Sequence, residues 1–90
     1  MNTHILERFP ELGNIDLRKN KLRFIPEEIG LLKKLEQLLL SDNRIEKLPN
    51  QIGELPNLRV LDLANNCLSE LPLALTTLPR LKHLNLQQNK

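Results

Sequence analysis

Residues 35–49 (LEQLLLSDNRIEKLP) and residues 58–72 (LRVLDLANNCLSELP) align without a gap, at the offset that separates Leu35 from Leu58. The same offset runs through the chain in four columns: Leu12, Leu35, Leu58 and Leu81; Ile15, Leu38, Leu61 and Leu84; Asn20, Asn43, Asn66 and Asn89; and Pro26, Pro49 and Pro72. A fixed period of this length predicts stacked copies of one small unit. We therefore expect a single repeat array, with a partial repeat at 1–11, whole repeats at 12–34, 35–57 and 58–80, and a partial repeat at 81–90.

Each unit predicts a strand, a turn and a short helical segment. Leu38 and Leu40 alternate around Leu39, the period-two pattern of a strand with one face inward. The asparagine after the strand suits a turn, because its amide can both donate to and accept from backbone groups. Ile52 and Leu55 are three residues apart, which favours one helical or 3-10 turn.

A proline and a glycine limit the length of the helical segment in the unit. The proline in each repeat excludes the two long helices of armadillo or tetratricopeptide units, and the repeat itself is too short to contain them. Gly30 and Gly53 would end the helical turn at little cost if a left-handed residue is required there. Thr76 stands at the same position in the following repeat, so the requirement for glycine is not strict.

The unit LxxLxLxxNxLxxLPxxIGxLxx resembles the leucine-rich repeat, in particular the 23-residue intracellular class of Ras-associated scaffolds, Scribble, erbin and plant Ras-group proteins. The resemblance implies an α/β repeat fold: a right-handed solenoid with a short parallel sheet on its concave face and short helical or 3-10 turns on its convex face. It also implies a protein-binding role, often in small-GTPase and polarity signalling.

If the repeated columns build the shape, a binding site must lie in the columns that vary. Neighbouring strands lie about 4.8 Å apart, so variable residues of the strands form one patch. Leu39 and Val60 provide an apolar centre with polar groups around them, as a modest protein interface requires. The predicted concave binding residues are Asp16, Arg18, Gln37, Leu39, Ser41, Val60, Asp62, His83, Asn85 and Gln87.

The remaining Asn, Cys and His side chains are predicted to have structural roles rather than catalytic or metal-binding ones. The periodic Asn20, Asn43, Asn66 and Asn89 predict a structural ladder, since buried amides must be paired. Cys67 follows the ladder where other repeats carry Lys or Arg, so we expect it to be exposed and to have no base that would activate its thiol. His4 and His83 lie in different repeats, and no cluster of metal ligands is visible. We expect no catalytic residues, no metal and no cofactor.

Composition narrows the partners and the compartment. The net charge is +2, the aromatic fraction is 2%, and no basic block occurs, which disfavours nucleic acid. No apolar run approaches the roughly 20 residues of a membrane span. The single cysteine fits a reducing compartment, and we expect the cytoplasm.

The strand at 81–86 is followed by only four residues, which predicts exposed leucines and a free strand edge. Two interpretations remain: a segment of a longer leucine-rich protein, which we favour, or end-to-end self-association. The predicted function is a non-catalytic scaffold or adaptor in intracellular signalling that docks a protein, a small GTPase being one candidate by resemblance. The alternatives are a recognition segment of a larger kinase or ubiquitin ligase, and a structural, self-associating solenoid.

Overall fold

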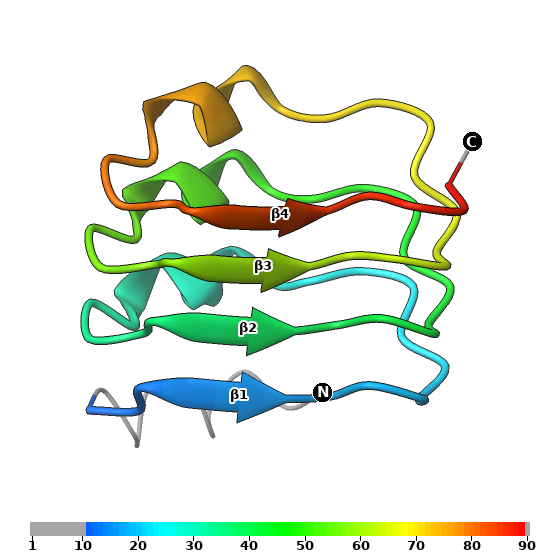
Figure 1. Cartoon of the computed structure of the whole chain (residues 1–90), viewed down its shortest axis with the longest axis horizontal. Helices are drawn as coiled ribbons and strands as arrows, with labels where there is room; N and C mark the ends of the chain where they lie inside the picture. The colour runs from blue at the N-terminus through cyan, green and yellow to red at the C-terminus, as the bar shows by residue number, and fades with distance from the viewer. Residues whose placement is uncertain (1–10, 90) are drawn as a thin grey trace.

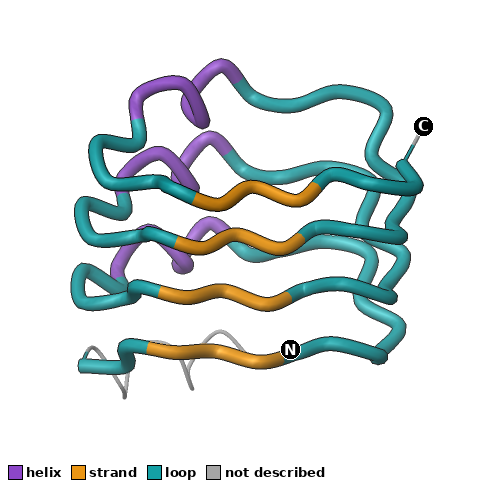
Figure 2. Tube along the Cα trace, viewed as in Figure 1, coloured by secondary structure: helices purple, strands orange, loops and turns teal. Residues whose placement is uncertain are grey.

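The computed structural model describes residues 11–89, which form a stack of similar coils (Figure 1). The predicted partial repeat at 1–11 falls almost wholly outside the described residues, as do His4 and Lys90. Strands and 3-10 helices alternate along the chain: β1 (Asn14–Asp16), η1 (Glu27–Leu31), β2 (Gln37–Leu39), η2 (Asn50–Glu54), β3 (Val60–Asp62), η3 (Leu73–Thr77) and β4 (His83–Asn85). The strands line one side of the stack and the 3-10 helices the other (Figure 2).

The four strands form one parallel sheet in the order β1-β2-β3-β4. Each strand pairs with the equivalent strand of the next repeat. The Cα partners at the first strand position are Asn14 with Gln37, Gln37 with Val60, and Val60 with His83. The period seen in the sequence therefore sets the register directly. This arrangement confirms the prediction of a right-handed repeat solenoid with a parallel sheet and short helical turns.

Each helical turn begins directly after a proline. Pro26, Pro49 and Pro72 are the N-cap residues, with φ of −70°, −72° and −67° and extended ψ. The ring holds φ near these values, and the proline carbonyl accepts from the amide three residues on, at 3.1 Å in all three turns. The amide donors are those of Ile29, Ile52 and Leu75, whose side chains are buried. Burial of this single residue anchors a helix of only five residues.

The glycines of these turns have a different role from the one predicted. No glycine among residues 11–89 has a positive φ, so neither Gly30 nor Gly53 supplies a left-handed residue at the end of its turn. A Cβ on Gly30 would lie 3.1 Å from Gln51 Cβ, and a Cβ on Gly53 would lie 2.6 Å from Ala74 Cβ. Glycine is thus required by the close stacking of successive turns. Thr76, the third residue of this column, is exposed because the described chain places no further turn against it.

The core is an aliphatic column that fills the space between the sheet and the 3-10 helices. Eleven side chains are less than 2% exposed: Ile29, Leu32, Leu35, Leu38, Leu40, Ile45, Ile52, Leu55, Leu58, Leu61 and Leu63. Full burial of one such side chain contributes about 1.5–3 kcal/mol. Each residue packs against its equivalents in neighbouring coils, so stability accumulates coil by coil.

Burial falls at the last described coil. Leu84 occupies the same column as Leu38 and Leu61, yet it is 41% exposed, whereas they are 1% and 0% exposed. Leu73 at the start of η3 is 85% exposed. The difference arises because the interior leucines are covered from both sides, and Leu84 is covered by β3 alone. None of the helices among residues 11–89 is long and apolar enough to cross a bilayer.

Candidate interaction surface on the sheet

The outward positions of the strands form two rows that cross all four coils. One row contains Asn14, Gln37, Val60 and His83, and the other contains Asp16, Leu39, Asp62 and Asn85. Alternation along the strand buries Leu38 and Leu61 and leaves their neighbours in the two rows half-buried. The structure therefore brings the predicted strand residues onto one face.

The middle of this face is hollowed. Leu39, Val60, Asp62, His83 and Asn85 line a depression of about 500 Å³. Lys82 also lines it and was not among the predicted residues. It lies one residue before β4, in the second position of its repeat.

Residues of the second row also stabilise the ends of their own strands. Asp16 Oδ1, Asp62 Oδ1 and Asn85 Oδ1 each accept from the backbone amide two residues on, at 3.1 Å. An Asp or Asn side chain is the right length for this local turn. These residues were predicted to contact a partner, and their structural contribution was not predicted although they share one column of the repeat.

Asp16 and Arg18 form a bidentate pair at the exposed end of the face. Arg18 Nε and Nη2 donate to Asp16 Oδ1 and Oδ2 at 2.9 and 2.8 Å. These hydrogen bonds, with the Arg18 backbone amide, lower the pKa of Asp16 from 3.8 to about 2. The pair therefore stays ionised across the physiological range. Its two charges largely cancel, so it presents a rigid dipole rather than a free ion.

Ser41 does not belong to the accessible surface. It was predicted as a contact residue, but it is 9% exposed. Its backbone carbonyl accepts a hydrogen bond from Lys19 N at 3.0 Å, which joins the turn after β2 to the turn after β1. Gln87, in the same column, is exposed, because its coil has a neighbour on one side only among residues 11–89.

The asparagine column connects the coils on the inner side of the turn. Asn66 is 8% exposed, and its Nδ2 donates to Leu63 O of its own coil at 3.1 Å and to Leu40 O of the preceding coil at 3.0 Å. Its Oδ1 accepts from Ile45 N at 3.0 Å. Asn43 and Asn89 make equivalent bonds one coil away in either direction. The amide therefore satisfies backbone groups that the turn would otherwise leave unpaired.

The remaining side chains with reactive groups are isolated. Cys67 was expected to be exposed like Arg44 and Lys21 in its column, but it is half-buried. Its backbone amide donates to Ile45 O at 2.9 Å, the same bond that Arg44 N makes to Leu22 O one coil earlier. In the described part of the chain, no three His, Cys, Asp or Glu residues lie close enough together to hold a metal ion.

Comparison with known proteins identifies the architecture. A family model described as "Leucine rich repeat" matches residues 33–90. A solved LRR protein of Leptospira interrogans is 38% identical, with a TM-score of 0.91 over 94% of this chain and 22% of its own. A plant ice-binding protein is 36% identical, with a TM-score of 0.85 over 99% of this chain and 30% of its own. The chain thus spans less than a third of either structure. Curated protein sequences give no significant match.

Proposed function

Because this chain belongs to the leucine-rich repeat family, whose fold generally mediates protein–protein interaction, we propose that the outward face of its sheet docks a protein partner. The observation that carries the proposal is the hollow around Leu39 and Val60. These two half-buried apolar side chains lie diagonally across adjacent strands, where Leu39 pairs with Asp62 and Val60 pairs with His83. An apolar centre with a polar rim is the usual composition of a protein interface.

The proposed mechanism is surface complementarity without chemistry. The strands are held by backbone pairing and by the asparagine column, so the face is rigid before binding and loses little entropy on association. Leu39 and Val60 supply apolar contact. The Asp16–Arg18 pair, Asp62 and His83 set the orientation of the partner through their polar groups.

The finer role that we propose is that of a scaffold or adaptor in intracellular signalling, located in the cytoplasm. Its support is the resemblance of the repeat unit to those of cytoplasmic scaffolds, which makes a small GTPase one candidate partner. The single cysteine is compatible with a reducing compartment.

The test substitutes two residues at the centre of the outward sheet face. The double variant Leu39→Asp with Asp62→Arg should abolish partner capture by the immobilised chain without unfolding it, although the loss of the Asp62 Oδ1 hydrogen bond to Ala64 N lowers its unfolding midpoint in urea. The matched control is Leu31→Asp with Glu27→Arg, which makes the same Leu-to-Asp exchange and an equivalent acidic-to-Arg exchange at exposed positions of η1. Capture that survives in the first variant, or is lost equally in both, would contradict the proposal.

A second candidate function is end-to-end self-association. It is favoured by the exposure of Leu84 in β4, which has one paired neighbour in the described sheet. Exposed strand edges and apolar ends promote pairing between chains. Molar mass measured by light scattering across a concentration series would rise with concentration if this occurs, and Leu84→Lys should prevent the rise.

A further inference from the structure

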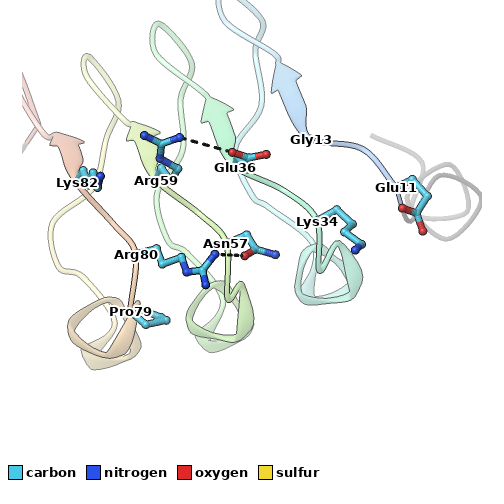
Figure 3. A pocket seen from close by; sticks show the side chains of 9 residues that line it. All are labelled: Glu11, Gly13, Lys34, Glu36, Asn57, Arg59, Pro79, Arg80 and Lys82. Atoms are coloured by element: carbon cyan, nitrogen blue, oxygen red, sulfur yellow. Dashed lines mark hydrogen bonds and ion pairs between the residues drawn. The ribbon is translucent and has the colours of Figure 1, made fainter.

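A second surface lies on the flank of the solenoid, where each 3-10 helix leads into the next strand. Residues from all four coils line an open groove of about 740 Å³ there (Figure 3). The groove consists of two rows that follow the period of the repeat. One row contains Glu11, Lys34, Asn57 and Arg80, and the other contains Gly13, Glu36, Arg59 and Lys82.

The rows carry a gradient of charge along the axis of the stack. Glu11 lies at the first coil and the opposite charges of Lys34 and Glu36 lie at the second, whereas Arg59, Arg80 and Lys82 lie in the last two (Figure 3). The groove contains four basic and two acidic side chains, an excess of +2. The whole sequence, with 13 basic and 11 acidic residues, has the same excess, so the rest of the chain is formally neutral.

The backbone holds the second row in place. Glu36 N donates to Gly13 O at 2.8 Å, Arg59 N to Glu36 O at 2.8 Å, and Lys82 N to Arg59 O at 2.9 Å. These bonds extend the pairing of the sheet by one residue and fix the side chains at strand spacing, about 4.8 Å. The basic residues are therefore presented as an ordered set rather than as scattered surface charges.

The cations of the last two coils retain most of their capacity to bind an anion. Arg80 Nη1 donates to the neutral Asn57 Oδ1 at 3.0 Å, and Asn57 Nδ2 in turn donates to Lys33 O at 2.8 Å. Arg59 approaches Glu36 at 3.8 Å, with both side chains more than half exposed, which is a weak pair. Lys82 has no carboxylate within ion-pair distance among residues 11–89.

We propose that this groove binds an extended protein segment that is acidic at one end, with its carboxylates on Arg59, Arg80 and Lys82. Guanidinium groups bind carboxylates through paired, charge-assisted hydrogen bonds. Alternate side chains of an extended peptide lie about 6.6–6.8 Å apart, so two or three carboxylates reach cations of adjacent coils. Neutral or basic residues of the same segment then lie beside Glu36 and Glu11.

The gradient disfavours a uniform polyanion. A nucleic acid following the groove would bring phosphates against Glu11 and Glu36, and an excess of +2 is small for a phosphate backbone. No aromatic side chain lines the groove to stack on bases. A peptide differs because its charge can change sign along its length and match the two ends.

The test is an NMR titration of the full chain with a synthetic peptide of three aspartates, a glycine–serine spacer and two lysines. Amide shifts should change mainly at residues 34–36, 57–59 and 80–82. Affinity should fall about tenfold when Arg59, Arg80 and Lys82 are all changed to Gln, as three exposed pairs predict. The matched control changes Lys21, Arg44 and Lys47 to Gln, an equal loss of charge at exposed positions outside the groove, and should retain wild-type affinity.

Other outcomes overturn the proposal. They are an absence of shifts in the wild-type groove, equal weakening in both triple variants, undiminished binding of a peptide with asparagine in place of aspartate, and tighter binding of oligouridylate than of the acidic peptide. The Leu39→Asp with Asp62→Arg variant should bind the peptide as the wild type does. Failure of the proposed sheet interface can thus be distinguished from failure of the groove.

Discussion

Gly53 lies against Ala74 of the next coil so closely that a Cβ on the glycine would be 2.6 Å from the alanine Cβ and 2.8 Å from its carbonyl oxygen. Gly53→Ala should therefore destabilise the chain by about 1–3 kcal/mol, because the two turns must move apart. Urea unfolding followed by circular dichroism measures the change. The double variant Gly53→Ala with Ala74→Gly should recover part of the loss, since one of the two clashing methyl groups is gone.

Gly13 provides the control for this effect. Among residues 11–89, a Cβ there would have only Lys34 O within 4.0 Å, and its φ is not positive. Gly13→Ala should be neutral or stabilise by up to about 1 kcal/mol through the reduced entropy of the unfolded chain. Equal destabilisation by Gly13→Ala and Gly53→Ala would show that coil stacking is not the cause.

Asn66 should be far more important for stability than Asn20, although both occupy the same column. Asn66→Ala leaves the Ile45 amide without its side-chain partner in a buried site, whereas Leu40 O still accepts from Asn43 Nδ2 at 2.9 Å. At about 1–3 kcal/mol for one unpaired buried group, a loss of about 1–3 kcal/mol is expected in denaturant unfolding.

Asn20 is exposed, and within the described part of the chain its side chain bonds only inside its own turn, to Leu17 O at 2.9 Å and Arg18 O at 3.3 Å. Asn20→Ala should cost less than about 1 kcal/mol, because water can replace the amide. A similar cost for both alanine variants would mean that the bonds between coils contribute little.

Lys19 adopts a left-handed conformation with φ of 60°, as do Asp42, Asn65 and Gln88 in the same column. Lysine has no local hydrogen bond that favours this region, whereas asparagine tolerates it. Lys19→Asn should stabilise by up to about 1 kcal/mol, and Lys19→Val should destabilise by a similar amount. Lys21→Asn makes the same exchange without a positive φ and should not raise the midpoint of thermal unfolding.

The Asp16 carboxylate should titrate abnormally only while Arg18 is present. Its pKa in the folded chain is about 2, below the ordinary 3.8, so its contribution to stability is fully present above pH 3.8 and is lost as the pH falls toward 2. Arg18→Met removes the cause, and the pKa should return toward 3.8. An NMR titration of the Asp16 carboxyl carbon measures both values, and an unchanged pKa in the variant would exclude Arg18 as the cause.

The sequence predicted the fold well because the core is periodic. Leu38 and Leu61 recur at one interval and alternate with outward residues, and parallel pairing in register follows from these two facts. The small size of the helical turns also follows from the proline in each unit. What periodicity cannot give is the distance between adjacent coils, and that distance explains why Gly53 is a glycine.

The candidate site was predicted less completely. Ser41 shares a column with exposed residues, but interior coils cover it from both sides, and a column does not encode which coil is interior. The groove on the flank was missed for a related reason. Arg59 and Lys82 are a whole repeat apart, so no basic run is visible, and only stacking brings them into one row.

The pairing of Asn14, Gln37, Val60 and His83 at one constant separation also bears on how such a protein changes over generations. Recombination that inserts or deletes one whole repeat leaves each surviving backbone group with an equivalent partner, whereas gain or loss of a single residue turns inward side chains outward. The length of the array is therefore inherited in discrete steps. With every step, each row of the sheet face and of the flank groove gains or loses one side chain.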